Sequence, residues 1–363
     1  MKKKGNFRKQ IVAGAALFIG ALLLVGLFVT GTSKAAKVTL SALVWEGYTD
    51  ESFTKVFLEK YGAEVKGTYV GGMDEFFAKV KAGGAASYDL VALSSNLPKR
   101  MIDSDLVQPI DLKNVPNYND IFEFFRKLDY NKKDGQVYGV NYTWGPDPVT
   151  YRTDVFTSCP PWDIFKDPKY KGKLSVPGED NTAVFQAGIL LGTDPYTMDK
   201  AKLEEAKKLL IQWRPQIRAF WSTAGELTNL IANKEVVASI SWPIITLDLK
   251  KQGIPVAECI PDPGTSGWID QWMVVKGTKN KDMAEKWINF AISPEGQYAV
   301  FKVTNYFIVN PKAAPLMTPD EKAFTHIDDP NYIVEASKKI KWWQPIQNEG
   351  EYNEVRQAFK TAK

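Results

Sequence analysis

The chain has 363 residues, of which 44% are hydrophobic, 12% aromatic and 24% charged. These values are typical of a globular protein and exclude a disordered, collagen-like or coiled-coil chain. The single histidine, His326, excludes a multi-histidine metal site and argues against a Ser-His-Asp triad. The two cysteines, Cys159 and Cys259, are too far apart for a CxxC redox motif or a zinc knuckle. We therefore expect no metal, no cofactor and no enzymatic activity.

The N-terminal segment differs from the rest of the chain. Met1–Gln10 carries five positive charges and no acid, and Ile11–Val29 is an uninterrupted apolar run. Ser33 and Ala35 are small residues at the spacing of a secretory cleavage site. The apolar run is also long enough to span a bilayer. Residues 1–35 are therefore predicted to be either a cleaved signal peptide or an uncleaved membrane anchor, and both alternatives place the remaining chain outside the cytoplasm.

The net positive charge of the whole chain comes from this N-terminal segment. Residues 1–35 contain six of the 46 Lys and Arg residues and none of the 42 acids, so the rest carries a net charge of about −2. A chain with this charge is a poor candidate for nucleic-acid binding.

After residue 36, strand and helix patterns alternate. Apolar runs predict three strands, and residues with helical spacing follow the first two of them. Asp50 and Gly62 are suited to begin and end the first of these helices. Three short units of this kind predict an open α/β sheet. The expected strands are 38–45, 63–70 and 88–93, and the expected helices contain Phe53, Val56, Phe57 and Tyr61, and Met73, Phe76, Phe77 and Val80.

The second half of the chain repeats this alternation, with two interruptions rich in Pro and Gly. These interruptions, residues 145–148 and 261–267, are interpreted as crossings between two lobes, with a ligand held in the cleft. The prediction is a bilobed α/β protein with residues 36–146 and 271–316 in lobe 1, and 147–270 and 317–363 in lobe 2. The expected strands are 137–144, 174–176, 236–241 and 269–275, and the expected helices are 198–213, 225–233 and 281–292.

Open α/β sheets bind ligands beyond the carboxyl ends of their strands. The residues at those ends are rich in tryptophan, tyrosine and carboxylate, and lack lysine and arginine. Aromatic faces and carboxylates together favour an organic cation, because rings attract ammonium groups and carboxylates accept charge-assisted hydrogen bonds from them. These residues are Trp45, Glu46, Tyr48, Ser94, Ser95, Asn96, Glu179, Asp180, Asn181, Trp242, Trp268 and Asp270.

Six stretches of the chain are distinctive enough to compare with known families. They are VWEGYTD (44–50), SYDLVALSS (87–95), DPKYKGKLSVPGEDNTAVFQ (167–186), SISWP (239–243), GWIDQWMV (267–274) and NYFIVNP (305–311). With these stretches, the chain from about Val38 to Lys363 resembles the bacterial periplasmic spermidine/putrescine-binding proteins of ABC importers. The resemblance implies a type II periplasmic-binding-protein fold, with two open α/β lobes joined by crossing hinge segments. It also implies a monomeric receptor in the periplasm or on the outer face of the cytoplasmic membrane, which delivers an amine to the permease subunits and their ATPase.

The resemblance assigns expected roles to individual residues. Asp180 and Asp270 would anchor amines, and Ser94 and Gln344 would make polar contacts. The aromatic box around the ligand methylenes would consist of Trp45, Tyr48, Trp242, Trp268 and Tyr306.

The sequence departs from the family pattern at three positions. Ala183 stands where the family typically has a second acid, and Asn96 where it often has an aromatic residue. Glu46 replaces a hydroxyl residue and would restore the lost charge. These changes are compatible with an amine-binding receptor, but the resemblance does not identify the amine.

Several alternatives remain open at this point. Tryptophan is often core filler, Asp180 is also suited to cap a helix, and Glu46 is also consistent with a solvated surface acid. A carbohydrate receptor of the same fold is the main rival function, and a thiaminase-like cysteine enzyme is a weaker one. Cys159 and Cys259 have no base nearby in the sequence, and outside the cytoplasm an even pair of cysteines is more often a disulfide.

Overall fold

A computed structural model describes residues 38–362. The predicted signal peptide or anchor, residues 1–35, lies outside the described residues. Within residues 38–362, no helix combines the length and the apolar character needed to cross a membrane.

The first strand–helix–strand unit follows from its capping residues. Strand β1 (Val38–Val44) leads to helix α1 (Glu51–Tyr61) and strand β2 (Ala63–Tyr69). The Asp50 carboxylate accepts a hydrogen bond from the Ser52 backbone N–H at 2.8 Å, which begins the helix. Gly62 ends it in the left-handed conformation, with φ of 70°, which glycine adopts without steric cost. The predicted order of these elements is confirmed.

The first sheet combines parallel and antiparallel pairs. Its order is β14-β7-β13-β3-β1-β2, with β1 parallel to β2 and β3, and β13 antiparallel to both β3 and β7. Every residue of β13 is buried, so this long strand forms the centre of the sheet. The further strands are β3 (Leu90–Ser94), β7 (Gly139–Pro146), β13 (Thr265–Val275) and β14 (Phe307–Ile308), with β4 (Val107–Gln108) and β15 (Ile340–Trp342) paired to β13.

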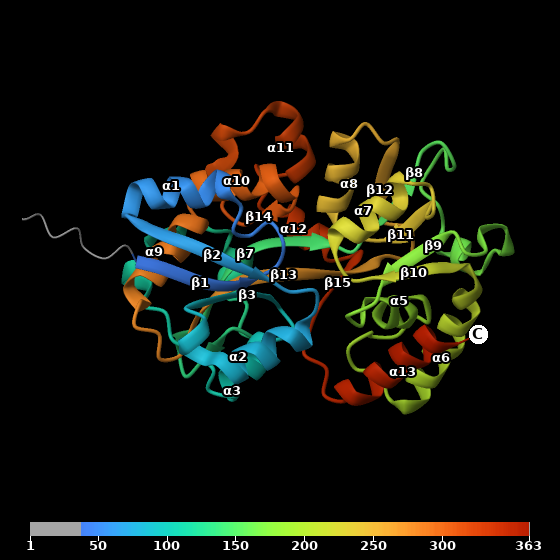
Figure 1. Cartoon of the computed structure of the whole chain (residues 1–363), viewed down its shortest axis with the longest axis horizontal. Coiled ribbons are helices and arrows are strands. Elements are labelled where there is room, and N and C mark those ends of the chain that lie inside the picture. The colour runs from blue at the N-terminus through green and yellow to red at the C-terminus, as the bar shows by residue number, and fades with distance from the viewer. Residues whose placement is uncertain (1–37, 363) are drawn as a thin grey trace, which may run out of the picture. The chain divides into compact units, whose positions relative to one another are not determined.

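Helices cover the first sheet, as Figure 1 shows with α2 and α3 on one side and α1 and α10 on the other. Met73, Phe76 and Val80 lie on the buried face of α2, as their spacing predicts. The helices here are α2 (Met73–Ser87), α3 (Pro98–Asp103), α4 (Glu123–Lys127), α9 (Lys281–Ala291) and α10 (Pro294–Thr304), and a small hairpin is formed by β5 (Lys132–Lys133) and β6 (Gln136–Val137).

The second sheet has the order β10-β9-β11-β8-β12 (Figure 1). Strands β9, β10 and β11 are parallel, and β8 runs antiparallel to its neighbours. Its strands are β8 (Val149–Arg152), β9 (Leu174–Pro177), β10 (Ile217–Trp221), β11 (Ala238–Ile240) and β12 (Val256–Cys259). The helices around it are α5 (Thr182–Leu190), α6 (Lys200–Trp213), α7 (Ala224–Ala232), α8 (Pro243–Lys251) and α13 (Glu349–Thr361).

The chain changes sheets over segments shorter than the predicted crossings. Strand β7 runs through Pro146 and β8 begins at Val149, so only residues 147–148 lie between the two sheets. The return lies at residues 260–264, because β13 begins at Thr265 and pairs with β7 from Gly267. Residues 265–270 therefore belong to the first sheet and not to lobe 2 as predicted. The Pro/Gly pattern misplaced this boundary because Gly267 is accommodated inside the strand.

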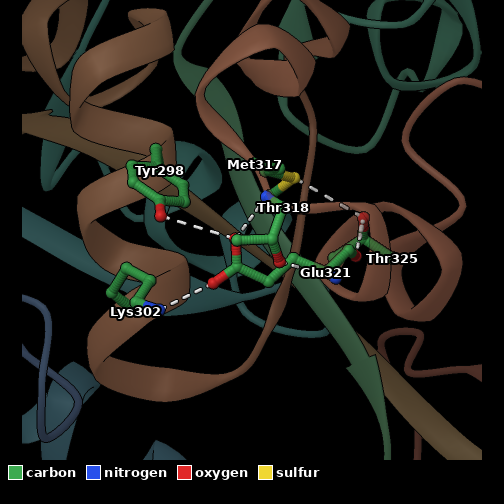
Figure 2. A network of polar contacts seen from close by, with 6 residues as sticks. All are labelled: Tyr298, Lys302, Met317, Thr318, Glu321 and Thr325. Atoms are coloured by element: carbon green, nitrogen blue, oxygen red, sulfur yellow. Dashed lines mark hydrogen bonds and ion pairs between the residues drawn. The ribbon is translucent and has the colours of Figure 1, made fainter.

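A second difference concerns residues 317–339, which were expected in lobe 2. Helix α11 (Pro319–Thr325) packs beside α10 of the first sheet, and Phe324 stacks on Phe307 of β14 at 5.4 Å between ring centroids. Figure 2 shows how Glu321 joins the two helices: it forms an ion pair with Lys302 at 2.6 Å and accepts a hydrogen bond from the Tyr298 hydroxyl at 3.4 Å. Glu321 also closes a capping box with Thr318. Helix α12 (Tyr332–Ala336) follows α11. Within the segment 317–363 that was expected in lobe 2, α13 packs against α6, a helix of the second sheet.

A disulfide joins Cys159 to Cys259 at the end of β12, with 5.9 Å between the Cα atoms. It encloses β9, β10 and β11 with their helices in one covalent loop. Short 3-10 helices complete the chain at Leu112–Asn114, Pro116–Asp120, Trp162–Lys166, Pro168–Tyr170, Arg214–Gln216 and Pro311–Leu316.

Candidate functional site

One pocket gathers most of the predicted ligand-binding residues between the two sheets. Residues after β1, at the end of β3 and within β13 come from the first sheet, and residues after β10 and β11 come from the second. We call it the aromatic compartment; its lining is Trp45, Glu46, Ser94, Ala224, Trp242, Ile244, Trp268, Asp270, Tyr306 and Trp343.

Asp270 is the buried acid of this compartment, with only 3% of its surface exposed. The Ser94 hydroxyl donates a hydrogen bond to Oδ1 at 2.5 Å, and the Tyr48 hydroxyl donates one to Oδ2. Tyr48 is held in turn by Thr143, whose hydroxyl lies 2.5 Å from its own. These contacts fix the orientation of the carboxyl group. No lysine or arginine among residues 38–362 forms an ion pair with it.

Burial dominates the electrostatics of Asp270. It raises the pKa of this carboxyl to about 7, although the hydrogen bonds from Ser94 and Tyr48 act in the opposite direction. Burial, and then the nearby Asp270 charge, also raise the pKa of Tyr48 and Tyr306 well above the usual range of a phenol, so both stay neutral donors. The compartment therefore contains a carboxyl group that a bound cation would favour in its ionised form.

Aromatic rings form the walls around this carboxyl. Trp268 packs edge-to-face on Tyr306 at 4.5 Å, and Trp45 on Trp242 at 6.0 Å. The Trp45–Trp242 contact joins the two sides of the cleft, because Trp45 follows β1 and Trp242 follows β11. Trp221 supports Trp242 from behind at 4.7 Å. Rings in such an arrangement present faces and edges that pack on methylenes and attract ammonium groups.

Glu46 lies at the exposed edge of the same compartment. Partial burial raises the pKa of Glu46, and the nearby carboxylate of Asp248 adds to this increase. Glu46 is therefore a second acid of the compartment, although a more solvated one than Asp270.

Several predicted residues lie elsewhere. Tyr48 is fully buried behind Asp270 and holds it through the hydrogen bond already described, without lining the pocket. Asp180 and Asn96 line a separate pocket, where the Asp180 carboxylate accepts a hydrogen bond from the Thr182 backbone N–H at 2.9 Å at the start of α5. Burial raises the pKa of Asp180, and Arg356 counteracts this effect. Gln344 lines a third pocket beside Tyr196 and Lys341.

The sequence analysis missed Trp343, Ala224 and Ile244. Trp343 directly precedes the predicted residue Gln344. Because successive side chains of an extended segment point to opposite sides, Trp343 lines the aromatic compartment and Gln344 lines a different pocket. Ala224 follows β10, which was not predicted as a strand. The same search of strand ends would have included Ala224 if β10 had been recognised.

The arrangement is suited to holding a solute. It offers apolar rings, one buried carboxyl group and an acid at the edge. Among the described residues, no group of three His, Cys, Asp or Glu side chains is placed to hold a metal ion. The two cysteines of the chain form the disulfide, so neither supplies a free thiol.

Fold and site together define a solute receptor, and the family model of bacterial extracellular solute-binding proteins matches residues 52–328. The chain belongs to this family and is a solute-binding protein, not an enzyme.

Similar proteins carry more specific descriptions. The spermidine/putrescine-binding periplasmic protein of Escherichia coli K12 is 25% identical over 305 residues, which cover 82% of this chain and 86% of that protein. A solved structure described as a putative spermidine/putrescine ABC transporter of Listeria monocytogenes superposes with a TM-score of 0.79 at 22% identity, covering 90% of this chain and 99% of that one.

The fold is therefore that of the periplasmic binding proteins, as predicted. Another solved structure of this fold comes from A. tumefaciens R10 and was determined in complex with agropinic acid. Its TM-score is 0.67 at 21% identity, covering 89% of this chain and 96% of that one. Proteins of this fold thus bind ligands of different chemistry, and the ligand of this chain must be argued from its own pocket.

Proposed function

We propose that this protein is an extracytoplasmic receptor that captures an aliphatic amine, of the putrescine or spermidine type, and delivers it to the permease of an ABC importer. The observation that carries the proposal is Asp270, a buried carboxyl group without a cationic partner among the described residues, enclosed by aromatic rings. A buried acid is costly unless it is paired, and an ammonium group supplies both the opposite charge and hydrogen-bond donors.

The walls support the same ligand class. The methylenes of an aliphatic amine pack on the rings of Trp45, Trp242 and Trp268, and each cation–π contact adds roughly 0.5–2 kcal/mol. An anionic solute would meet two acids, Asp270 and Glu46, and no lysine or arginine in the lining. The descriptions of the Escherichia coli and Listeria proteins agree with an amine.

Titration calorimetry of the purified chain tests the proposal. We expect saturable binding of putrescine or spermidine, with the amine recovered unchanged. Asp270→Asn should weaken binding by roughly 2–5 kcal/mol, because a neutral amide cannot pair with the ammonium group. Asp180→Asn is the matched control: it changes a buried acid outside the compartment and should leave the affinity for putrescine within about twofold.

Two results would contradict the proposal. One is saturable binding of an oligosaccharide without any amine binding, which would favour a carbohydrate receptor. The other is an unchanged amine affinity in the Asp270→Asn variant, which would place the amine elsewhere in the molecule.

A further inference from the structure

Trp343 separates two pockets along the cleft. Among residues 38–362, it is the one that lines both the aromatic compartment and a second pocket, which we call the acidic compartment and which includes Asp74, Asp180, Glu349 and Arg356. A ligand that reached from Asp270 to Asp180 would have to pass the indole ring of Trp343.

Several contacts hold Trp343 in this position. Its backbone N–H donates to the Gly267 carbonyl at 2.7 Å, and its own carbonyl accepts from the Ser95 hydroxyl at 2.6 Å. The indole Nε1 donates to the buried carboxyl of Asp147 at 3.2 Å. Only 3% of the residue is exposed. The two backbone hydrogen bonds fix this segment of the chain, and the bond to Asp147 together with burial fixes the indole, so the ring acts as a wall.

The charges on the two sides of Trp343 differ. The aromatic compartment contains two acids, Asp270 and Glu46, and no basic side chain. The acidic compartment contains its own cation, Arg356, and one oxygen of Asp180 already accepts a backbone hydrogen bond. Within the aromatic compartment, two ammonium groups therefore find a carboxylate each, and a third would be left without a carboxylate in a lining that is otherwise mostly apolar, at a cost in desolvation.

We propose that Trp343 is a specificity-determining residue, which confines the ligand to the aromatic compartment and thereby selects a short aliphatic cation with at most two ammonium groups. The inference rests on the proposed function, since it concerns the length and charge of the amine. Asp180 then takes no part in binding, in contrast to its predicted role as a second anchor.

The first test uses the unmodified chain and three amines. Putrescine is short and carries two ammonium groups. The diamine 1,8-diaminooctane also carries two ammonium groups but is about as long as spermidine, which carries three. Calorimetry should give an affinity for putrescine at least tenfold higher than for either longer amine. Equal or tighter binding of both longer amines would overturn the inference without affecting the proposed function, whereas no binding of any amine would overturn both.

The second test removes the indole ring that separates the two compartments. Trp343→Ala should join the compartments and raise the spermidine affinity at least tenfold relative to that of putrescine, and Asp180→Asn in this background should reverse the gain. Trp343→Phe retains a ring and is the matched control, which should keep the preference for putrescine. Thermal unfolding checks that each variant is folded. An unchanged ratio of affinities in folded Trp343→Ala would overturn the inference; if this variant does not fold, the amine series on the unmodified chain decides.

Discussion

If a cation binds as proposed, Asp270 is the group whose protonation state should change. Without a ligand its two oxygens accept hydrogen bonds from Ser94 and Tyr48, and burial raises its pKa to about 7. The Asp270 charge contributes to the raised pKa values of Tyr48 and Tyr306, which stay neutral, and burial raises the pKa of Asp147 to about 8, so that this carboxyl also keeps its proton at pH 7. An ammonium group favours the ionised carboxylate, so binding below pH 7 is accompanied by proton release.

We therefore predict that amine affinity rises with pH. Below pH 7 the increase should approach roughly tenfold per pH unit, and it should level off above pH 7, where Asp270 is already ionised. Above about pH 10 the amine itself loses its charge and affinity should fall. Calorimetry between pH 5 and 8 measures this slope, and Asp270→Asn should abolish it. A slope that persists in this variant would assign the proton to another group.

The raised pKa of Asp270 also affects the stability of the ligand-free protein. Amine affinity should rise with pH, whereas this stability should fall. In the unfolded chain an Asp loses its proton near pH 4, whereas folded Asp270 and Asp147 keep theirs to about pH 7 and 8. The folded state thus binds more protons between these values, and the free energy of unfolding decreases as pH rises from about 4 to 8. Urea unfolding at pH 5 and 8 should show this decrease in the unmodified chain, and a smaller decrease in Asp270→Asn.

The sequence located some site residues better than others. Trp45, Ser94, Trp242, Trp268 and Asp270 were predicted from strand ends, because the end of a strand fixes where the next side chains lie, and all five line one pocket. Trp343 comes from a segment near the C-terminus whose pairing with β13 has no local signal. The prediction named Gln344 instead of Trp343, and this difference of one residue corresponds to the opposite face of that segment.

At the scale of elements, the disulfide ties an edge strand to the segment that follows its neighbouring strand. Strand β12 lies at the edge of the second sheet, and Cys259 at its end is bridged to Cys159, which follows β8 by a short segment. The covalent loop spans a sequence separation of 100 residues. The pocket residues of the second sheet, Ala224, Trp242 and Ile244, lie inside this loop in sequence, but neither cysteine lines the compartment.

We predict that the Cys159→Ser/Cys259→Ser variant is less stable but still binds its ligand. Closing a loop of this length restricts the unfolded chain, and its loss should cost about 2–5 kcal/mol in the free energy of unfolding. Urea denaturation followed by tryptophan fluorescence measures the change. Amine affinity should stay within about twofold. A variant with unchanged stability would show that the bridge constrains the unfolded chain little, and one that folds normally yet no longer binds would give the bridge a role in the site.

Elements were predictable where local signals were strong. The alternation of strands and helices from Val38 to Ser94 was foreseen because caps, glycines and apolar spacing agree there. Strands β8 and β10 were missed, since neither their length nor their pattern separates them from loops. The position of α11 was missed as well, because it depends on contacts with Phe307, Tyr298 and Lys302 that no local pattern specifies.

At the scale of the whole receptor, a pair of glycines lies where the two sides of the cleft meet. A Cβ atom on Gly71 would approach the Ser222 carbonyl oxygen to 2.9 Å, and one on Gly72 would approach that of Glu179 to 2.9 Å. Neither glycine has a positive φ, so alanine fits the local backbone of both. The steric conflict arises between the loop before α2 and the loops after β9 and β10, which lie on opposite sides of the cleft.

We predict that Gly72→Ala weakens amine binding by roughly 1–3 kcal/mol, about 5- to 150-fold, because the extra methyl group opposes closure around the ligand. Thermal stability should change little. Gly350→Ala, at an open position in α13, is the matched control and should bind normally. In scattering experiments at saturating amine, the unmodified chain should become more compact and Gly72→Ala less so. Normal affinity of Gly72→Ala would mean that binding does not require this contact.

The place of β13 between β3 and β7 also determines the order in which the protein can be assembled. Synthesis delivers β3 and β7 within the first 146 residues, whereas β13 begins at residue 265, after most of the second sheet has been made. At about 5–20 residues per second, the inner edges of β3 and β7 remain without their partner for on the order of ten seconds. Unpaired strand edges are templates for aggregation. The strands of the second sheet are thus all synthesised before those of the first are complete, and we expect a nascent chain of this receptor to be most prone to aggregation before its central strand has emerged.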